Sequence, residues 1–264
     1  MSSQTITTTK WLQRIWKPLI LIIFIVFLLN FALAATSWRT LSKGLEYRDI
    51  DRSYITPWSH IHTFRIDLNA NKLSSIMAKD LALKHASADE YAKHSKALIS
   101  INGGFFDEEF HPLGLRITDS HLQSPMKQIS WWGVFYTRNN KAHVVAARQF
   151  KRDKQINFAI QSGPRLLING RIPPLKPGRA ERSALGVTAD GKVILLVTDN
   201  SPLSTTELAQ IMKAAPLNCM NAINLDGGSS SQLRAQIDKF HLNVHGFSNV
   251  SDAVVVTPLS LPSP

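Results

Sequence analysis

Short apolar runs separated by turn residues make up most of the sequence after residue 45, and this pattern narrows the possible folds more than any other feature. The runs are rich in Val, Ile, Phe and Thr, and Gly, Pro, Asn or Asp bound them. Runs of this kind predict β-strands. Two segments predict helices, because each opens with the Ser-x-x-Glu spacing of a capping box, at Ser87 and Ser204. The chain is expected to be α+β, with a mostly antiparallel sheet and a few packed helices.

The same pattern sets the expected boundaries. Strands are expected at 45–50, 61–68, 73–77, 97–101, 114–118, 131–136, 143–147, 156–161, 165–168, 184–189, 192–198, 220–225, 231–237 and 252–259. Helices are expected at 87–97 and 206–215. Asp190-Gly191 stands between two of these strands and predicts a two-residue hairpin turn. The globular domain is expected to span 45–260, after a linker at 36–44.

Residues 1–35 differ from the rest and are interpreted as an export segment. Lys10, Arg14 and Lys17 come before an apolar run from Leu19 to Ala35. This order predicts that the amino end stays in the cytoplasm while the rest of the chain is exported. The run approaches the length of a membrane span, so we favour a retained anchor helix over a signal peptide cleaved after Ala34. The protein is expected in the cell envelope, on the exported side of the cytoplasmic membrane, or as a periplasmic or secreted protein if the segment is cleaved.

The formal net charge of +11 suits an anionic partner. Nucleic acid is not expected, because the predicted location is outside the cytoplasm and the Lys and Arg residues are scattered instead of forming one stripe. Anionic glycans, phosphodiesters or a lipid surface fit better. The single cysteine, Cys219, allows no intrachain disulfide and is expected to be a small buried apolar residue.

Three expected strands end in glycine-containing turns with a polar residue beside them. Asn102 and Asp226 occupy equivalent points, each directly before Gly-Gly and after an apolar run, and the third turn contains Gly163. Glycine permits positive φ and close approach of a ligand to the backbone, and successive amides can bind an anion. The turns are therefore expected to converge on one site at one end of the sheet. Taken singly, each is better explained as an ordinary turn.

Five segments occur in an order and spacing that resembles the phosphodiester glycosidase family: INGGFF (101–106), GPRLLING (163–170), RSALGVTADGKVILLVTD (182–199), TELAQIMKAAP (206–216) and NAINLDGGSSSQL (221–233). The resemblance covers residues 45–258. Family members usually have a third glycine where this chain has Ser229, and Asp-Gly where it has Asp199-Asn200. The resemblance implies an exported bacterial hydrolase that cleaves the glycosidic bond of a sugar 1-phosphodiester.

The resemblance also implies roles for individual residues. Asp226 is expected to act on the anomeric carbon, directly or through a water, while Arg182 holds the phosphate through paired hydrogen bonds. Asn102 and the glycine amides of the turns are expected to orient the sugar and the leaving oxygens.

Further residues in or beside these turns are expected to bind the substrate: Gly103, Gly104, Asp107, Gly163, Arg165, Glu181, Asp199, Gly227, Gly228, Ser229 and Ser230. A second carboxylate could come from Asp107, Glu181 or Asp199, and the sequence does not rank them. Retention or inversion of configuration depends on the separation of two carboxylates, which the sequence does not give.

The main assignments have simpler alternatives. Asp226 could only cap its turn, and Arg182 could be a surface residue paired with Glu181 or another acid. No metal or other cofactor is expected, although the acidic run at 107–109 offers the oxygen ligands that a divalent cation prefers.

Other patterns predict less. His241 and His245 are four apart, but no glutamate stands where a zinc-protease helix needs it. The serines at 229–231 lack the Gly-x-Ser-x-Gly turn of many serine hydrolases. Trp131 and Trp132 could stack on a sugar, or one could pack in the core while the other lies half exposed, and the second use is commoner.

Two functions of different class are therefore expected. The first is an exported hydrolase acting on a sugar 1-phosphodiester in an envelope or exopolysaccharide glycan. The second is a non-catalytic envelope protein that binds anionic glycans. We favour the hydrolase, because a protein that only binds anions has little use for a carboxylate at the site.

Overall fold

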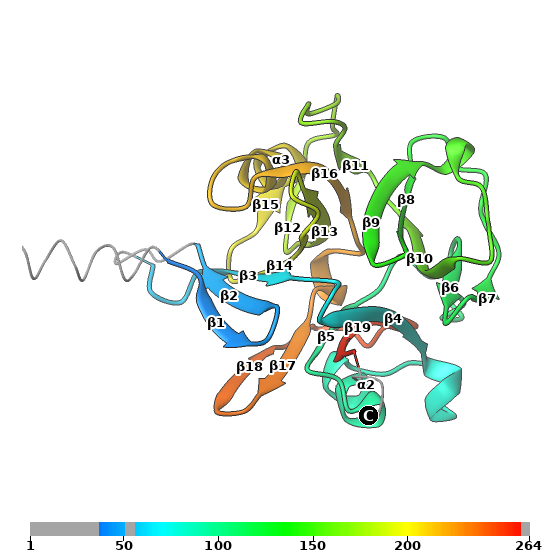
Figure 1. Ribbon diagram of the computed structural model, residues 1–264, viewed down its shortest axis with the longest axis horizontal. Helices are drawn as coiled ribbons and strands as arrows, with labels where there is room; N and C mark the ends of the chain where they lie inside the picture. The colour runs from blue at the N-terminus through cyan, green and yellow to red at the C-terminus, as the bar shows by residue number, and fades with distance from the viewer. Residues whose placement is uncertain (1–36, 51–55, 260–264) are drawn as a thin grey trace, which may run out of the picture. The chain divides into compact units, whose positions relative to one another are not determined.

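The two expected helices and a counterpart of each expected strand are present in the computed structural model, which describes residues 37–50 and 56–259. The export segment expected at 1–35, with its signal or anchor helix, lies outside the described residues. Within these ranges, no helix is long and apolar enough to cross a membrane. From Thr40 onward the described chain forms one compact unit (Figure 1).

The largest sheet has seven strands in the order β1-β2-β3-β14-β13-β16-β11. Its strands are β1 (Arg39–Ser42), β2 (Leu45–Asp49), β3 (His60–Ile66), β11 (Arg165–Leu167), β13 (Ser183–Thr188), β14 (Val193–Asp199) and β16 (Cys219–Asn224). The central strands β13 and β14 are buried along almost their whole length. This burial on both faces explains why they read as continuous apolar runs.

Two five-stranded sheets and a two-stranded ribbon complete the domain. One five-stranded sheet has the order β18-β17-β5-β19-β4 and contains β4 (Asn71–Met77), β5 (Ile99–Asn102), β17 (Leu233–Ile237), β18 (Phe240–Val244) and β19 (Asp252–Pro258). The other has the order β7-β6-β10-β8-β9 and contains β6 (Arg116–Thr118), β7 (His121–Ser124), β8 (Gly133–Arg138), β9 (Lys141–Ala146) and β10 (Ile156–Ser162). The ribbon pairs β12 (Arg179–Ala180) with β15 (Leu203–Ser204). The fold is sheet-dominated α+β, with mostly antiparallel pairing.

Both α-helices begin with the predicted capping box. At α2 (Ala88–Ser95), the Ser87 N–H donates to the Glu90 carboxylate at 2.8 Å, and the Glu90 N–H donates to the Ser87 hydroxyl. Ser204 and Glu207 form the same arrangement at α3 (Thr205–Lys213). Helix α2 packs beside β5 and β19, and α3 packs beside β11 and β16 (Figure 1).

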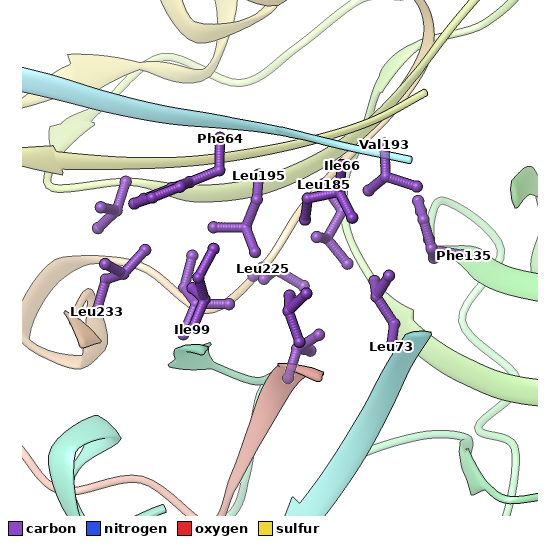
Figure 2. Packing of buried hydrophobic residues seen from close by; sticks show 14 of the residues in the cluster. Phe64, Ile66, Leu73, Ile99, Phe135, Leu185, Val193, Leu195, Leu225 and Leu233 are labelled. Carbon is purple, nitrogen blue, oxygen red and sulfur yellow. The ribbon is translucent and has the colours of Figure 1, made fainter. Parts of the chain in front are cut away.

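The main core lies between the seven-stranded sheet and the two five-stranded sheets (Figure 2). Phe64 and Leu195 project into it from the large sheet, and Ile99 faces them from β5. Leu225 is fully buried in the same cluster. Because Leu225 is anchored in the core, Asp226, the next residue, is held at the edge of the core.

Some details differ from the sequence-based expectation. The Asp190-Gly191 connection is longer than two residues, because β13 ends at Thr188 and β14 begins at Val193. The expected linker contains β1, which lies beside β2. Four more short strands, β7, β12, β15 and β18, are additional to the expected set. Strands β7 and β18 contain few buried residues, so they lack the apolar pattern that predicts a strand. Cys219 is buried as expected, and burial raises the pKa of its thiol.

Candidate active site

Asp226 follows β16, and its main chain is held from β5 and from the adjoining turn. Its backbone N–H donates to the Gly103 carbonyl at 3.2 Å, and its own carbonyl accepts a hydrogen bond from Asn102 Nδ2 at 2.8 Å. Asn102 and Asp226 are 124 positions apart in the sequence. Two of the three predicted turns therefore meet at one point of the fold.

The Asn102 side chain is fully buried, and its hydrogen-bonding positions are used internally. Nδ2 donates to the carbonyls of Asp226 and Gly103, at 2.8 and 3.2 Å. Oδ1 accepts from the Ser183 hydroxyl at 2.7 Å and from the Gln232 N–H at 3.2 Å. A side-chain amide has two N–H donors and two acceptor positions, so no capacity is left for a sugar. The structure thus gives Asn102 a positioning role at the Asp226 loop.

Arg182 directly precedes β13, the strand that pairs with β16, and its backbone lies beside that of Asp226. The β13–β16 register pairs Ala184 with Asn224, and continuing it by two residues places Arg182 opposite Asp226. One guanidinium nitrogen, Nη1, lies 3.7 Å from the position that a Cβ on Gly227 would occupy. All three residues expected to carry the chemistry are therefore in one corner of the fold.

The Arg182 guanidinium is fixed by carbonyl groups. Nε donates to the Leu203 carbonyl at 2.8 Å, and Nη2 donates to the Gly178 carbonyl at 2.7 Å. Among the described residues, no carboxylate forms an ion pair with Arg182, so the surface pair with Glu181 is not observed. Partial burial lowers the pKa of Arg182, yet an arginine in a protein stays charged at neutral pH. The site therefore holds a positive charge without an acidic partner.

Burial raises the pKa of the Asp226 carboxyl above the ordinary value of an aspartate. Hydrogen bonds from Ser230 and from the Gly227 N–H, which donates to Oδ1 at 2.9 Å, reduce this shift. The charge of Asp252 adds to the shift, and that of Arg116 opposes it. The Gly227 contact shows that Asp226 does cap its turn. The raised pKa is also what a catalytic carboxyl needs for proton transfer nearer neutral pH.

A buried ion pair lies under the Asn102 turn, and sequence reasoning missed it. Arg116 Nε donates to Asp252 Oδ2 at 2.6 Å, and both side chains are fully buried. A Cβ on Gly103 would lie 2.2 Å from Asp252 Oδ2, and one on Gly104 would lie 2.5 Å from Arg116 Nη2. These glycines therefore make room for the ion pair. The available signal was a charged residue at the start of each of two otherwise largely apolar strands.

The remaining turn glycines also differ from the expectation of positive φ. A Cβ on Gly227 would lie 2.9 Å from the Glu181 carbonyl oxygen, and one on Gly163 would lie 2.7 Å from Trp132 Cδ1. Among the five turn glycines only Gly228 has a positive φ, of 62°. Close packing explains the other four.

The expected anion-binding role of the glycine amides is limited by bonds that these amides already make. The Gly103 N–H donates to the Asp252 carbonyl at 2.8 Å, and the Gly227 N–H donates to Asp226. The Gly228 N–H donates to the Glu181 carbonyl at 2.8 Å. These three amides are therefore not available to bind an anion.

Glu181 lies closest to the Asp226 loop among the three candidates for a second carboxylate, since its carbonyl binds Gly228. Its carboxylate accepts a hydrogen bond from the Thr198 hydroxyl. Asp199 is one strand further away, opposite His60 in the β14–β3 pair. Glu181 is therefore the best placed of the three.

Asp107 lies in an exposed turn with Glu109 and His111, and one ligand atom of each residue lies within 4.8 Å of the others. Asp107 Oδ1 already accepts the N–H groups of Glu109 and His111, at 3.0 and 2.8 Å. The acidic run at 107–109 is thus explained as a self-capped turn.

Arg165 and Trp132 border the Gly163 turn. The Arg165 side chain covers Gly133, and partial burial lowers its pKa. Trp132 is buried and stacks on Phe105, with ring centroids 5.2 Å apart. Trp131 is 57% exposed. The packing use expected for this pair is therefore confirmed.

Comparison with known proteins shows the family to which the chain belongs. A phosphodiester glycosidase family model matches residues 95–257, a span that includes the three central site residues. The uncharacterized protein YigE of Escherichia coli (strain K12) is 31% identical over 155 residues, which cover 54% of this chain and 60% of YigE. The match thus spans less than two thirds of that relative.

Solved structures share the fold. The catalytic domain of zebrafish N-acetylglucosamine-1-phosphodiester alpha-N-acetylglucosaminidase, auto-inhibited by its pro-peptide, is similar with a TM-score of 0.61 and 20% identity, covering 84% of this chain and 86% of that one. A hypothetical protein from Synechocystis is similar with a TM-score of 0.59 and 17% identity, and the match covers 83% of this chain and 63% of that one. A putative exported protein from Burkholderia pseudomallei K96243 is similar with a TM-score of 0.58 and 14% identity, and the match covers 76% of this chain and 74% of that one. Because the family model covers more than half of the sequence, the chain belongs to the phosphodiester glycosidase family.

Proposed function

We propose that this chain is a hydrolase that cleaves the bond between the anomeric carbon of a sugar and a phosphodiester. Family membership supports a hydrolase of the glycosidase type. The observation that carries the proposal is the position of Arg182 beside Asp226: a cation without an acidic partner next to a partly buried carboxyl.

Arg182 binds the phosphate in this proposal. The Leu203 and Gly178 carbonyls fix the guanidinium before substrate arrives, and Nη1 faces the turn that follows Asp226. A planar guanidinium can donate two parallel hydrogen bonds to phosphate oxygens, and its charge offsets the charge of the leaving group. The leaving group is a phosphate monoester and a weak base, so it needs less protonation than an alcohol would.

Asp226 acts on the anomeric carbon, either as a nucleophile or by deprotonating the attacking water. Either route requires the ionised carboxylate, and either route yields a reducing sugar and a phosphate monoester. The anomer formed first distinguishes the routes: net retention indicates a covalent intermediate, and inversion indicates direct attack by water. Glu181 is the proposed second carboxylate, because its backbone carbonyl accepts the Gly228 N–H of the Asp226 loop.

The proposed substrate is a sugar-phosphate linkage of an envelope or exopolysaccharide glycan. The supports are the basic residues and apolar run before residue 36, which are typical of exported proteins, and the net charge of +11, which favours anionic polymers. The proposed location is the exported side of the cytoplasmic membrane.

The test is incubation of the purified exported portion with a panel of sugar 1-phosphodiesters, followed by measurement of free reducing sugar. Turnover by the wild-type protein, absent in Asp226→Asn, is expected. Tight binding of the same compounds without turnover would instead favour a non-catalytic glycan-binding protein.

A further inference from the structure

Phe247 stands almost wholly in solvent beside the candidate active site. Its side chain is 94% exposed, more than any other large hydrophobic side chain in the described ranges. A phenylalanine in this position contributes almost nothing to the core. Single exposed apolar residues are common on protein surfaces, so exposure alone indicates no function. The way in which its loop is fixed carries the inference.

The residues on both sides of Phe247 pack against the loop that follows Asp226. The Ser248 N–H donates to the Ser229 carbonyl at 3.0 Å, and the Ser248 carbonyl accepts from Gln232 Nε2 at 2.9 Å. A Cβ on Gly246 would lie 2.8 Å from Gln232 Nε2 and 3.0 Å from the Ser229 carbonyl oxygen, so a larger residue at this position would displace one of these neighbours. The backbone that carries Phe247 is thus fastened to the candidate catalytic loop.

The same network reaches the residue that positions Asp226. Gln232 is buried, and its N–H donates to Asn102 Oδ1 at 3.2 Å. Farther along the chain, Val250 pairs with Ala86 through two backbone hydrogen bonds. The main chain around Phe247 is therefore fixed on both sides, while its ring faces water.

We propose that Phe247 is a specificity-determining residue whose ring stacks on a pyranose ring of the substrate. This inference rests on the proposed function. One face of a pyranose presents C–H bonds, which pack favourably on the electron-rich face of an aromatic ring. Ser229, which accepts the hydrogen bond from the Phe247 loop, lies in the short 3₁₀ turn Gly228–Ser230, only three residues after Asp226 in the sequence.

Substitution of Phe247 provides a direct kinetic test. Because the side chain is exposed, Phe247→Ala should leave the thermal midpoint unchanged. It should raise KM for a sugar 1-phosphodiester about tenfold with little change in kcat, while Phe247→Tyr retains a KM near the wild-type value. Leu122→Ala is the matched control, because Leu122 is 44% exposed and lies on β7 in a different sheet. Unchanged KM in Phe247→Ala would overturn the proposal.

A binding measurement separates this inference from the proposed hydrolysis. Titration of Asp226→Asn and of Asp226→Asn/Phe247→Ala with glucose 1-phosphate and N-acetylglucosamine 1-phosphate should show about tenfold weaker binding to the double variant. If the wild-type protein hydrolyses nothing but this difference is found, the hydrolase proposal fails and the Phe247 assignment stands. Equal binding to both variants, or no binding to either, would overturn it. The proposal would also be overturned if Phe247→Ala weakened binding to anionic phospholipid vesicles but left binding of the sugar phosphates unchanged. That result would assign the ring to a membrane surface.

Discussion

Asn102 Nδ2 donates a 2.8 Å hydrogen bond to the backbone carbonyl of Asp226, joining the end of β5 to the loop after β16. The same amide accepts hydrogen bonds from Ser183 and Gln232. One buried side chain at the end of β5 thus connects the Asp226 loop, the first residue of β13 and the residue before β17. The position of the candidate catalytic carboxyl depends on this amide.

Asn102→Ala should destabilise the protein and reduce turnover together. The substitution leaves the buried Ser183 hydroxyl, Gln232 N–H and Asp226 carbonyl without their partner, at a cost of roughly 2–4 kcal/mol in the free energy of unfolding. Urea unfolding measures the change. Asn157→Ala, at an exposed position of β10, serves as the control and should be nearly neutral. A wild-type unfolding midpoint for Asn102→Ala would show that the network does not support the loop.

Arg116→Met should lower the free energy of unfolding by more than the change in side-chain size alone would. It leaves the Asp252 carboxylate buried without a partner, which costs about 3–5 kcal/mol. Adding Asp252→Asn should recover part of this loss, because the unpaired charge is then removed. Arg138→Met breaks an exposed pair with Asp153 and should leave the unfolding free energy nearly unchanged. If the losses of unfolding free energy in Arg116→Met and in Asp252→Asn simply add in the double variant, the two residues are not coupled.

Asp226→Asn should raise the thermal midpoint at pH 7. The folded pKa of Asp226 lies above its unfolded value, so the folded state holds the proton more tightly and loses stability as the pH rises through that pKa. Below the unfolded pKa of about 3.9, both states are neutral and the gain should vanish. Asp67→Asn should show the opposite sign, since the hydrogen bond from Lys192 lowers the pKa of Asp67. Thermal unfolding of both variants at several pH values checks this, and a gain that is independent of pH would contradict the burial of Asp226.

Arg182→Lys should weaken phosphate recognition more than it affects the fold. Lysine keeps one positive charge but loses the planar fork, with an expected loss of about 1–3 kcal/mol in substrate binding. Steady-state kinetics should show the loss mainly in KM. Arg138→Lys, at an exposed position of β8, is the control. If KM is unchanged in Arg182→Lys, the phosphate is bound elsewhere.

Features encoded over a few residues could be predicted from the sequence. The two capping boxes depend on side chains three residues apart, such as Ser87 and Glu90, and both helices begin where those pairs predict. Most strands were likewise predicted by their apolar pattern. The placement of Asn102 and Asp226 in one corner followed from their equivalent positions at strand ends.

Features that depend on packing between distant segments could not be predicted. Arg116 and Asp252 are 136 positions apart, and nothing local shows that each is buried against the other. Gly103 and Gly104 were interpreted through backbone freedom, whereas the structure explains them by the space that this ion pair occupies. The saturated bonding of Asn102 is also a tertiary property. The same holds for Phe247, whose loop is defined by contacts with Ser229 and Gln232.

The measurement that tests the central claim most directly is release of free reducing sugar from a panel of sugar 1-phosphodiesters by the wild-type protein and by Asp226→Asn, side by side. Asparagine keeps the size of the side chain and can still accept the Gly227 N–H, so the fold should be intact and substrate binding retained or improved by the loss of repulsion between two anions. We expect turnover by the wild-type protein and none by Asp226→Asn at equal protein concentration and undiminished substrate binding. Full activity in Asp226→Asn would remove Asp226 from the mechanism and leave the capping of its turn as its only role.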